Sequence, residues 1–130
     1  MYPQHLRYTK THEWVGYDKA TNTVTTGITE FAVKALGDLV YVELPEVGEL
    51  LEIGHPYAEV ESVKAVANIY GAVSANITEA NEELPNNLDW LVHDAYGKGW
   101  IAKGKAPNDN EFQKLMEAAA YEKHCASEKH

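Results

Sequence analysis

The stretch from residue 57 to residue 70 constrains the fold most, because it holds two short strand-forming runs with almost nothing between them. Tyr57–Ser62 and Ala65–Tyr70 alternate in side-chain character, which is typical of strands that bury one face. Val63 and Lys64 then fall at the tip of a β-hairpin. The tip lacks the Gly or Asn that a tight hairpin turn prefers, so its sequence indicates a role beyond turning the chain.

Lys64 is the residue at this tip that could carry chemistry. A lysine at a loop tip usually contributes only to solubility, because lysine side chains are mostly exposed. Small and aliphatic residues flank Lys64, and the carboxylates of Glu59 and Glu61 lie back along the strand. A free lysine has a pKa near ~10.4, so at neutral pH it is a poor nucleophile unless it is buried. A functional Lys64 is therefore expected to carry a covalent group rather than to catalyse a reaction.

The length and charge of the chain exclude several classes of protein. With 130 residues and a mass of 14.5 kDa, the chain is expected to form one domain over residues 1–130. Its 20 acidic and 11 basic residues give a net charge of −9, which argues against a nucleic-acid-binding surface. The single cysteine, Cys125, excludes an internal disulfide.

The N-terminal sequence and the hydropathy bear on location. Residues 1–7 contain no apolar segment of the kind found in signal peptides. No run approaches the ~18 apolar residues that span a bilayer. We therefore expect a cytoplasmic protein without a membrane partner, or a protein of the mitochondrial matrix if the chain is a trimmed precursor.

The remaining pattern predicts a mainly β domain whose core spans roughly residues 8–106. Further strands are expected where β-branched and aromatic residues lie between turn residues, namely at Glu13–Tyr17, Thr23–Ile28, Asp38–Leu44, Ala72–Ala80 and Trp100–Lys103. The side chains expected in the core are Trp14, Val40, Val42, Val60, Ile69, Ile77 and Trp100.

Short helices are expected at the edges of this domain. Thr29 has the position of an N-cap for a helix over Glu30–Leu36, and Gly37 is a stop signal. Asn86–Val92 predicts a second, short helical piece.

A longer helix is expected at the C-terminus, over roughly residues 109–124. Asn108 is the predicted cap, and Glu111 would complete a capping box three residues later. The apolar face of this helix is predicted to consist of Phe112, Leu115, Met116 and Ala119.

Motifs for catalysis or metal binding are missing from the sequence. The six histidines show no metal-ligand spacing relative to one another or to Cys125; they are His5, His12, His55, His93, His124 and His130. Gly97-Lys98-Gly99 is too short for a phosphate-binding loop and precedes a strand. We therefore expect no catalytic residue and no metal site, and the chain is not expected to be an enzyme.

Residues 61–65, Glu-Ser-Val-Lys-Ala, resemble a lipoyl-attachment motif, and the chain as a whole resembles the H protein family of the glycine cleavage system. The resemblance covers roughly Tyr8 to Tyr121. It is specific because several segments match in order: residues 8–14, 27–30, 36–38, 40–48 and 96–100.

The resemblance implies a flattened barrel-sandwich hybrid with lipoate attached to Lys64 at a hairpin tip. Glu61, Ser62, Val63 and Ala65 would complete the attachment motif. The implied function is to carry an aminomethyl group from glycine decarboxylase, a pyridoxal-phosphate enzyme, to a tetrahydrofolate-dependent aminomethyltransferase. Dihydrolipoamide dehydrogenase would reoxidise the arm, and a lipoate ligase or a lipoyl or octanoyl transferase would attach it.

The resemblance also indicates where the loaded arm rests. Glu13 matches the family's glutamate at that site, although it could equally be an ordinary carboxylate at a strand edge. Asn68 stands where the family usually has Asp, so a second carboxylate is missing from the expected pocket. Phe31 occupies a position often held by His.

Two other functions remain open from the sequence. One is a divergent H-like protein that serves lipoate relay or another lipoyl-dependent reaction. The other is an unmodified binding or regulatory module that keeps only the fold. A biotin carrier is disfavoured, because Lys64 lacks the flanking methionines typical of that family.

Overall fold

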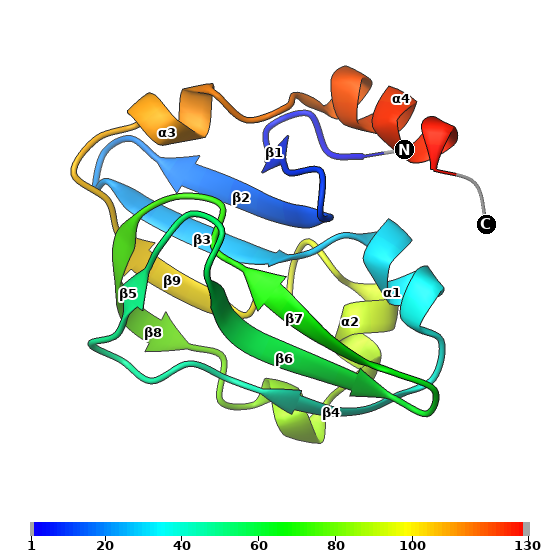
Figure 1. Ribbon diagram of the computed structural model, residues 1–130. Coiled ribbons are helices and arrows are strands. Elements are labelled where there is room, and N and C mark those ends of the chain that lie inside the picture. The colour runs from blue at the N-terminus through cyan, green and yellow to red at the C-terminus, as the bar shows by residue number, and fades with distance from the viewer. Residues whose placement is uncertain (1, 129–130) are drawn as a thin grey trace.

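The computed structural model describes residues 2–128 and shows two antiparallel sheets edged by short helices (Figure 1). A six-stranded sheet has the order β1-β2-β3-β9-β8-β5, and a three-stranded sheet has the order β4-β6-β7. The strands of the first sheet are β1 (Arg7–Tyr8), β2 (Glu13–Asp18), β3 (Thr23–Ile28), β9 (Ala102–Lys105), β8 (Ala75–Ala80) and β5 (Leu50–Leu51). Those of the second are β4 (Leu39–Glu43), β6 (Pro56–Ser62) and β7 (Val66–Tyr70).

The mainly β fold class is confirmed, in the form of two sheets that face each other across one core. Val42, Val60 and Ile69 from the three-stranded sheet join Val15 and Ile77 from the six-stranded sheet in that core. Within residues 2–128 the two sheets do not close into a single hydrogen-bonded barrel. The flattened shape follows, because only a layer of aliphatic side chains separates the sheets.

The first helix follows its sequence signals closely. α1 (Glu30–Leu36) begins where Thr29 Oγ1 accepts a hydrogen bond from the Ala32 amide at 3.3 Å. It ends at Gly37, whose φ of +85° is a conformation that glycine adopts without steric cost. The expected helical piece after residue 86 is present as α2 (Asp89–His93), preceded by the 3₁₀ turn η1 (Leu84–Asn86).

The C-terminal segment differs from the prediction of one continuous helix over residues 109–124, which is wrong. It contains two helices, α3 (Asn110–Gln113) and α4 (Ala118–Ser127). The chain extends between them because Met116 forms a two-hydrogen-bond bridge with Tyr8 of β1, with N···O distances of 2.9 and 3.0 Å. None of the helices described here has the length and apolar character required to cross a membrane.

The predicted capping box at α3 is also wrong. Asp109, not Asn108, occupies the N-cap position, and its side chain makes no capping hydrogen bond. The Glu111 carboxylate instead accepts hydrogen bonds from the amide and the hydroxyl of Ser74, at 2.6 and 3.2 Å. This contact holds residues 72–74 outside the ladder, so β8 begins at Ala75 rather than at Ala72.

The predicted core is confirmed at five of its seven positions: Trp14, Val42, Val60, Ile69 and Ile77 are all buried. Trp100 is only half-buried and lies two positions before β9. That strand begins at Ala102 and runs on to Lys105 instead of ending at Lys103. Val40 was expected in the core but is 50% exposed. The reason is a bulge in β4 between Leu39 and Tyr41, which interrupts the alternation of inward and outward side chains.

Candidate functional site

Lys64 lies at the tip of the β6–β7 hairpin, which projects from one end of the three-stranded sheet (Figure 1). The strands pair in register up to Glu61 and Val66. Lys64 is exposed, as are its neighbours Val63 and Ala65. The sequence prediction of a hairpin with Lys64 at its turn is confirmed.

Ser62 explains how this turn forms without glycine or asparagine. Its side chain is buried, and its Oγ accepts hydrogen bonds from the amides of Lys64 and Ala65, at 3.3 and 3.1 Å. The Ser62 amide donates to the Ala65 carbonyl at 2.7 Å, and the Val63 amide donates to the Asp38 carbonyl at 2.9 Å. A serine hydroxyl that satisfies local backbone amides substitutes for the usual turn residues. The backbone at the base of the exposed Lys64 side chain is therefore fixed.

The surface around Lys64 combines exposed apolar side chains with the exposed carboxylate of Glu61. Val63 is 74% exposed and Val66 is 60% exposed, and Tyr41 on the neighbouring strand is 51% exposed. Tyr41 pairs with Glu61 across the β4–β6 ladder, so it lies beside the same hairpin. An exposed group of apolar side chains around one lysine is typical of a surface that docks onto another protein.

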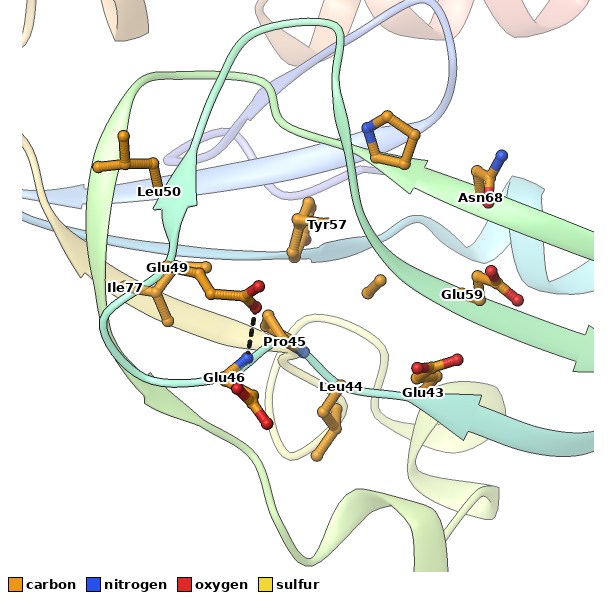
Figure 2. Close-up of a pocket in the computed structure, with 12 residues that line it drawn as sticks. Glu43, Leu44, Pro45, Glu46, Glu49, Leu50, Tyr57, Glu59, Asn68 and Ile77 are labelled. Carbon is orange, nitrogen blue, oxygen red and sulfur yellow. Dashed lines mark hydrogen bonds between the residues drawn. The ribbon is translucent and has the colours of Figure 1, made fainter.

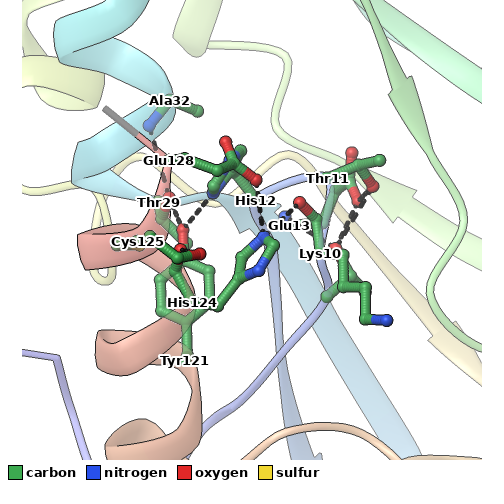
Figure 3. Close-up of polar contacts among 12 residues, drawn as sticks. Lys10, Thr11, His12, Glu13, Thr29, Ala32, Tyr121, His124, Cys125 and Glu128 are labelled. Atoms are coloured by element: carbon green, nitrogen blue, oxygen red, sulfur yellow. Dashed lines mark hydrogen bonds and ion pairs between the residues drawn. The ribbon is translucent and has the colours of Figure 1, made fainter. Parts of the chain in front are cut away.

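Glu13 lies at the start of β2 and is buried, with 2% of its surface exposed. Its Oε1 accepts hydrogen bonds from the hydroxyls of Thr9 and Thr11, at 2.6 and 2.5 Å (Figure 3). Its Oε2 accepts the backbone amide of Tyr70, the last residue of β7, at 3.2 Å. Glu13 is therefore not an ordinary solvated carboxylate at a strand edge.

A cavity of about 410 Å³ opens beside this carboxylate. Thr9, Thr11, Glu13 and Tyr70 contribute to its polar side, and Ile53, Ala72 and Leu115 contribute to its apolar side. Burial raises the pKa of the Glu13 carboxyl, while the hydrogen bonds from Thr11 and Thr9 oppose that rise. Two carboxylate oxygens offer about four acceptor positions, and donors within residues 2–128 occupy three of them, so about one position remains on this cavity-lining carboxylate.

Asn68 does not line the Glu13 cavity. It is exposed on β7 and lines a separate hollow of about 370 Å³, together with Glu43, Glu49 and Glu59. Figure 2 shows Asn68 and Glu59 on adjacent strands, with Glu49 on the opposite side of the hollow. Because side chains two residues apart share a face of a strand, Asn68 points to the same side of β7 as Val66 and Tyr70.

A second polar cluster, which sequence reasoning missed, lies behind the Glu13 turn (Figure 3). His12 from this turn and His124 from α4 both contact the carboxylate of Glu128, at 2.9 and 2.7 Å. The available signal was the i,i+4 spacing of His124, on α4, and Glu128, the residue that follows the end of α4. Nothing in the sequence indicated that His12, more than 100 residues away, would join them.

The family model described as "Glycine cleavage H-protein" matches residues 6–128. The chain belongs to this family. A glycine cleavage system H protein of Rhodopirellula baltica is 47% identical over 126 residues, which cover 95% of both chains. A probable glycine cleavage system H protein of Pyrococcus furiosus is 50% identical over 117 residues, covering 89% of this chain and 86% of the relative.

The fold is that of the same family. A solved glycine cleavage system H protein from Mycobacterium marinum superposes with a TM-score of 0.86 at 35% identity, covering 96% of this chain and 99% of the other. The H proteins of the glycine cleavage system are lipoate carriers, so the family, the hairpin and the exposed lysine agree with one another.

Proposed function

We propose that this chain is the lipoyl carrier of a glycine cleavage system and that Lys64 is its one lipoylated residue. The observation that carries the proposal is an exposed amine at a turn whose backbone is held by the buried Ser62. A lipoate ligase, or a lipoyl or octanoyl transferase, needs access to that amine in a reproducible geometry. The remaining motif residues, Glu61, Val63 and Ala65, are exposed and available for recognition. No catalytic residue is assigned to the carrier itself.

Attached lipoate supplies a dithiolane that accepts an aminomethyl group derived from glycine and is left as a dithiol when that group departs. The proposed partners are a pyridoxal-phosphate glycine decarboxylase, a tetrahydrofolate-dependent aminomethyltransferase and dihydrolipoamide dehydrogenase. Formation of the amide would remove the charge of Lys64 and leave Val63 and Val66 exposed at the tip, beside the carboxylate of Glu61. Tethering keeps the cargo at a high effective concentration for each partner in turn.

The outer face of β7 offers a path for the arm. This face carries Val66, Asn68 and Tyr70 in sequence, leading from the Lys64 turn to the Glu13 cavity. We place Asn68 along this path, where its amide can hydrogen-bond to the arm but contributes no charge.

Glu13 is proposed to receive the amine at the end of the loaded arm. The carboxylate is buried, lies against a cavity and retains one acceptor position. An approaching ammonium group favours the ionised carboxylate and so opposes the effect of burial on its pKa. Enclosure in the cavity would also keep water from the loaded arm.

Intact mass and peptide mapping test the attachment site. Protein produced with lipoate and its ligase is expected to gain one lipoyl group, on Lys64. Lys64→Arg should abolish the modification, because arginine does not form this amide, while Lys19→Arg, an exposed control between β2 and β3, should be modified normally. Lipoate on another lysine would refute the assignment.

An assay with glycine decarboxylase tests the carrier function separately. Lipoylated protein should support decarboxylation of glycine, and Lys64→Arg protein should not. Full lipoylation without this activity would favour a divergent H-like protein over a glycine cleavage carrier.

A further inference from the structure

His12, His124 and Glu128 bring three potential metal ligands together where α4 packs on the turn before β2 (Figure 3). Their ligand atoms all lie within 4.8 Å of one another. The shortest contacts join the Glu128 carboxylate to Nε2 of His12 at 2.9 Å and to Nε2 of His124 at 2.7 Å. The three side chains are 13%, 20% and 35% exposed for His12, His124 and Glu128, so an ion can reach them from solvent.

The His12 ring is held in the orientation that a metal ligand requires. Its Nδ1 lies 2.7 Å from the Tyr121 hydroxyl, which is 2.6 Å from Thr29 Oγ1. Histidine ligands usually donate their second ring N–H to an oxygen atom, which fixes the ring and leaves the other nitrogen free for the metal. The ring also stacks on Phe31, with centroids 4.4 Å apart.

The backbone conformation of His12 also indicates a functional role for this residue. His12 has a φ of +74°, one of two positive values among the non-glycine residues that the structure describes. Such a conformation costs free energy and persists where the surroundings require it, often at functional sites. Here it turns the imidazole of His12 toward α4, away from the Glu13 cavity that its neighbours line.

We propose that His12 Nε2, His124 Nε2 and the Glu128 carboxylate bind a divalent ion of the zinc class. Two imidazoles and one carboxylate suit zinc, whereas magnesium and calcium prefer oxygen ligands. On a tetrahedral ion with bonds of about 2.0–2.1 Å, the ligand atoms would be about 3.3 Å apart, so side-chain shifts of about 1 Å suffice. A water molecule would complete the coordination.

Binding would exchange hydrogen bonds for metal bonds. Both histidines would give up their contacts with Glu128, and Nε2 of His124 would also give up its hydrogen bond to the Lys10 carbonyl, 3.0 Å away. A proton carried by a ligating Nε2 would be released to solvent or move to Nδ1 of the same ring. In return, the ion would tie α4 to the turn that contains His12. Because Thr11 and Glu13 flank His12 and line the cavity, the same ion would stiffen one wall of that cavity.

The competing interpretation is a metal-free contact between α4 and the His12 turn, in which the histidines only hydrogen-bond to Glu128. Isothermal titration calorimetry with zinc chloride, repeated with magnesium chloride, separates the two. The protein is full-length, free of any histidine tag, and carries Lys64→Arg so that no lipoyl dithiol competes for the ion. This background also makes the test independent of the proposed carrier function.

The expected result is saturable binding of one zinc ion and none of magnesium. His124→Gln and Glu128→Gln should each weaken zinc binding by roughly tenfold or more. His12→Asn should do the same, because asparagine tolerates a positive φ but cannot place a ligand at the Nε2 position. The control His93→Gln, an exposed histidine on α2, should bind as the parent does.

Thermal unfolding gives a second readout, since an ion that binds only the folded state raises the melting temperature. Zinc should raise it for the parent and for His93→Gln, but not for His124→Gln. The proposal is overturned if the parent shows no saturable zinc binding, or if His124→Gln and Glu128→Gln bind as tightly as the parent. It is overturned equally if binding is lost only in Cys125→Ser or in His130→Gln, which lies outside the described residues.

Discussion

Glu13→Gln should shorten the lifetime of the loaded arm. The substitution keeps the size of the side chain but removes its charge and replaces one oxygen with an NH₂ group. If the remaining oxygen stays with Thr9 and Thr11, the NH₂ group faces the Tyr70 amide, which is itself a donor. The last acceptor position in the cavity is then lost, and a donor faces the arm's amine instead.

The size of the effect follows from the lost hydrogen bond. A hydrogen bond to a charged group contributes about 1.5–3 kcal/mol, and each 1.4 kcal/mol changes a population tenfold. If only the released arm meets water, hydrolysis should accelerate by roughly 10- to 150-fold.

The assay follows formaldehyde release from loaded protein in the absence of the aminomethyltransferase. Glu79→Gln is the matched control, because Glu79 is an exposed carboxylate on β8 that lines neither the Glu13 cavity nor the hollow that contains Asn68. The unloaded variants are compared by urea unfolding, which separates a weakened fold from a weakened resting site. A hydrolysis rate for Glu13→Gln equal to that of the parent would refute the role of this carboxylate and leave it a structural one.

Three further predictions concern the turn, the arm's path and the core of the site. Ser62→Ala should cost about 0.5–1.5 kcal/mol per lost hydrogen bond and slow lipoylation measured by mass spectrometry. The control Thr78→Ala also removes a hydroxyl hydrogen bond, but on the exposed side of β8, and should leave the rate of lipoylation unchanged. Asn68→Asp should slow hydrolysis of the loaded arm, by a smaller factor than Glu13→Gln accelerates it, and an unchanged rate would remove Asn68 from the path. Burial raises the pKa of Glu13 above 4.5, so its contribution to the free energy of unfolding should be largest below pH ~4.5 and should decline as pH rises through the folded-state pKa. Urea unfolding across pH 3–7 should show this decline in the difference between the unfolding free energies of the parent and of Glu13→Gln. A difference that grows with pH would contradict the prediction.

Local signals predicted the parts of the fold that depend on neighbouring residues. The Thr29 cap, the Gly37 stop and the β6–β7 hairpin all rest on contacts within a few positions in the chain. The position of Lys64 at the tip of this hairpin could be predicted for the same reason, since the residues that form the tip are contiguous. What sequence reasoning did not supply was the part played by Ser62, because a buried hydroxyl that closes a turn looks like any other serine.

The errors arise where distant residues override local preference. Met116 has a helical pattern around it but pairs with Tyr8, and Glu111 leaves the expected capping box for Ser74. Val40 is a β-branched residue of the kind found in cores but lies in a bulge that no sequence pattern marks. The association of His12 with α4 also depends on residues that are distant in the sequence, because it forms only when the C-terminal segment packs on β1.

The bridge between Met116 and Tyr8 covers one edge of the six-stranded sheet. β1 is an edge strand of the six-stranded sheet, and the unpaired backbone groups of an edge strand can form hydrogen bonds with another protein chain. The backbone amide and carbonyl of Met116 hydrogen-bond to those of Tyr8. The Arg7 guanidinium donates hydrogen bonds to the carbonyls of Gln113 and Leu115, at 3.0 and 3.2 Å. The segment between α3 and α4 therefore protects this edge of the sheet from edge-to-edge aggregation.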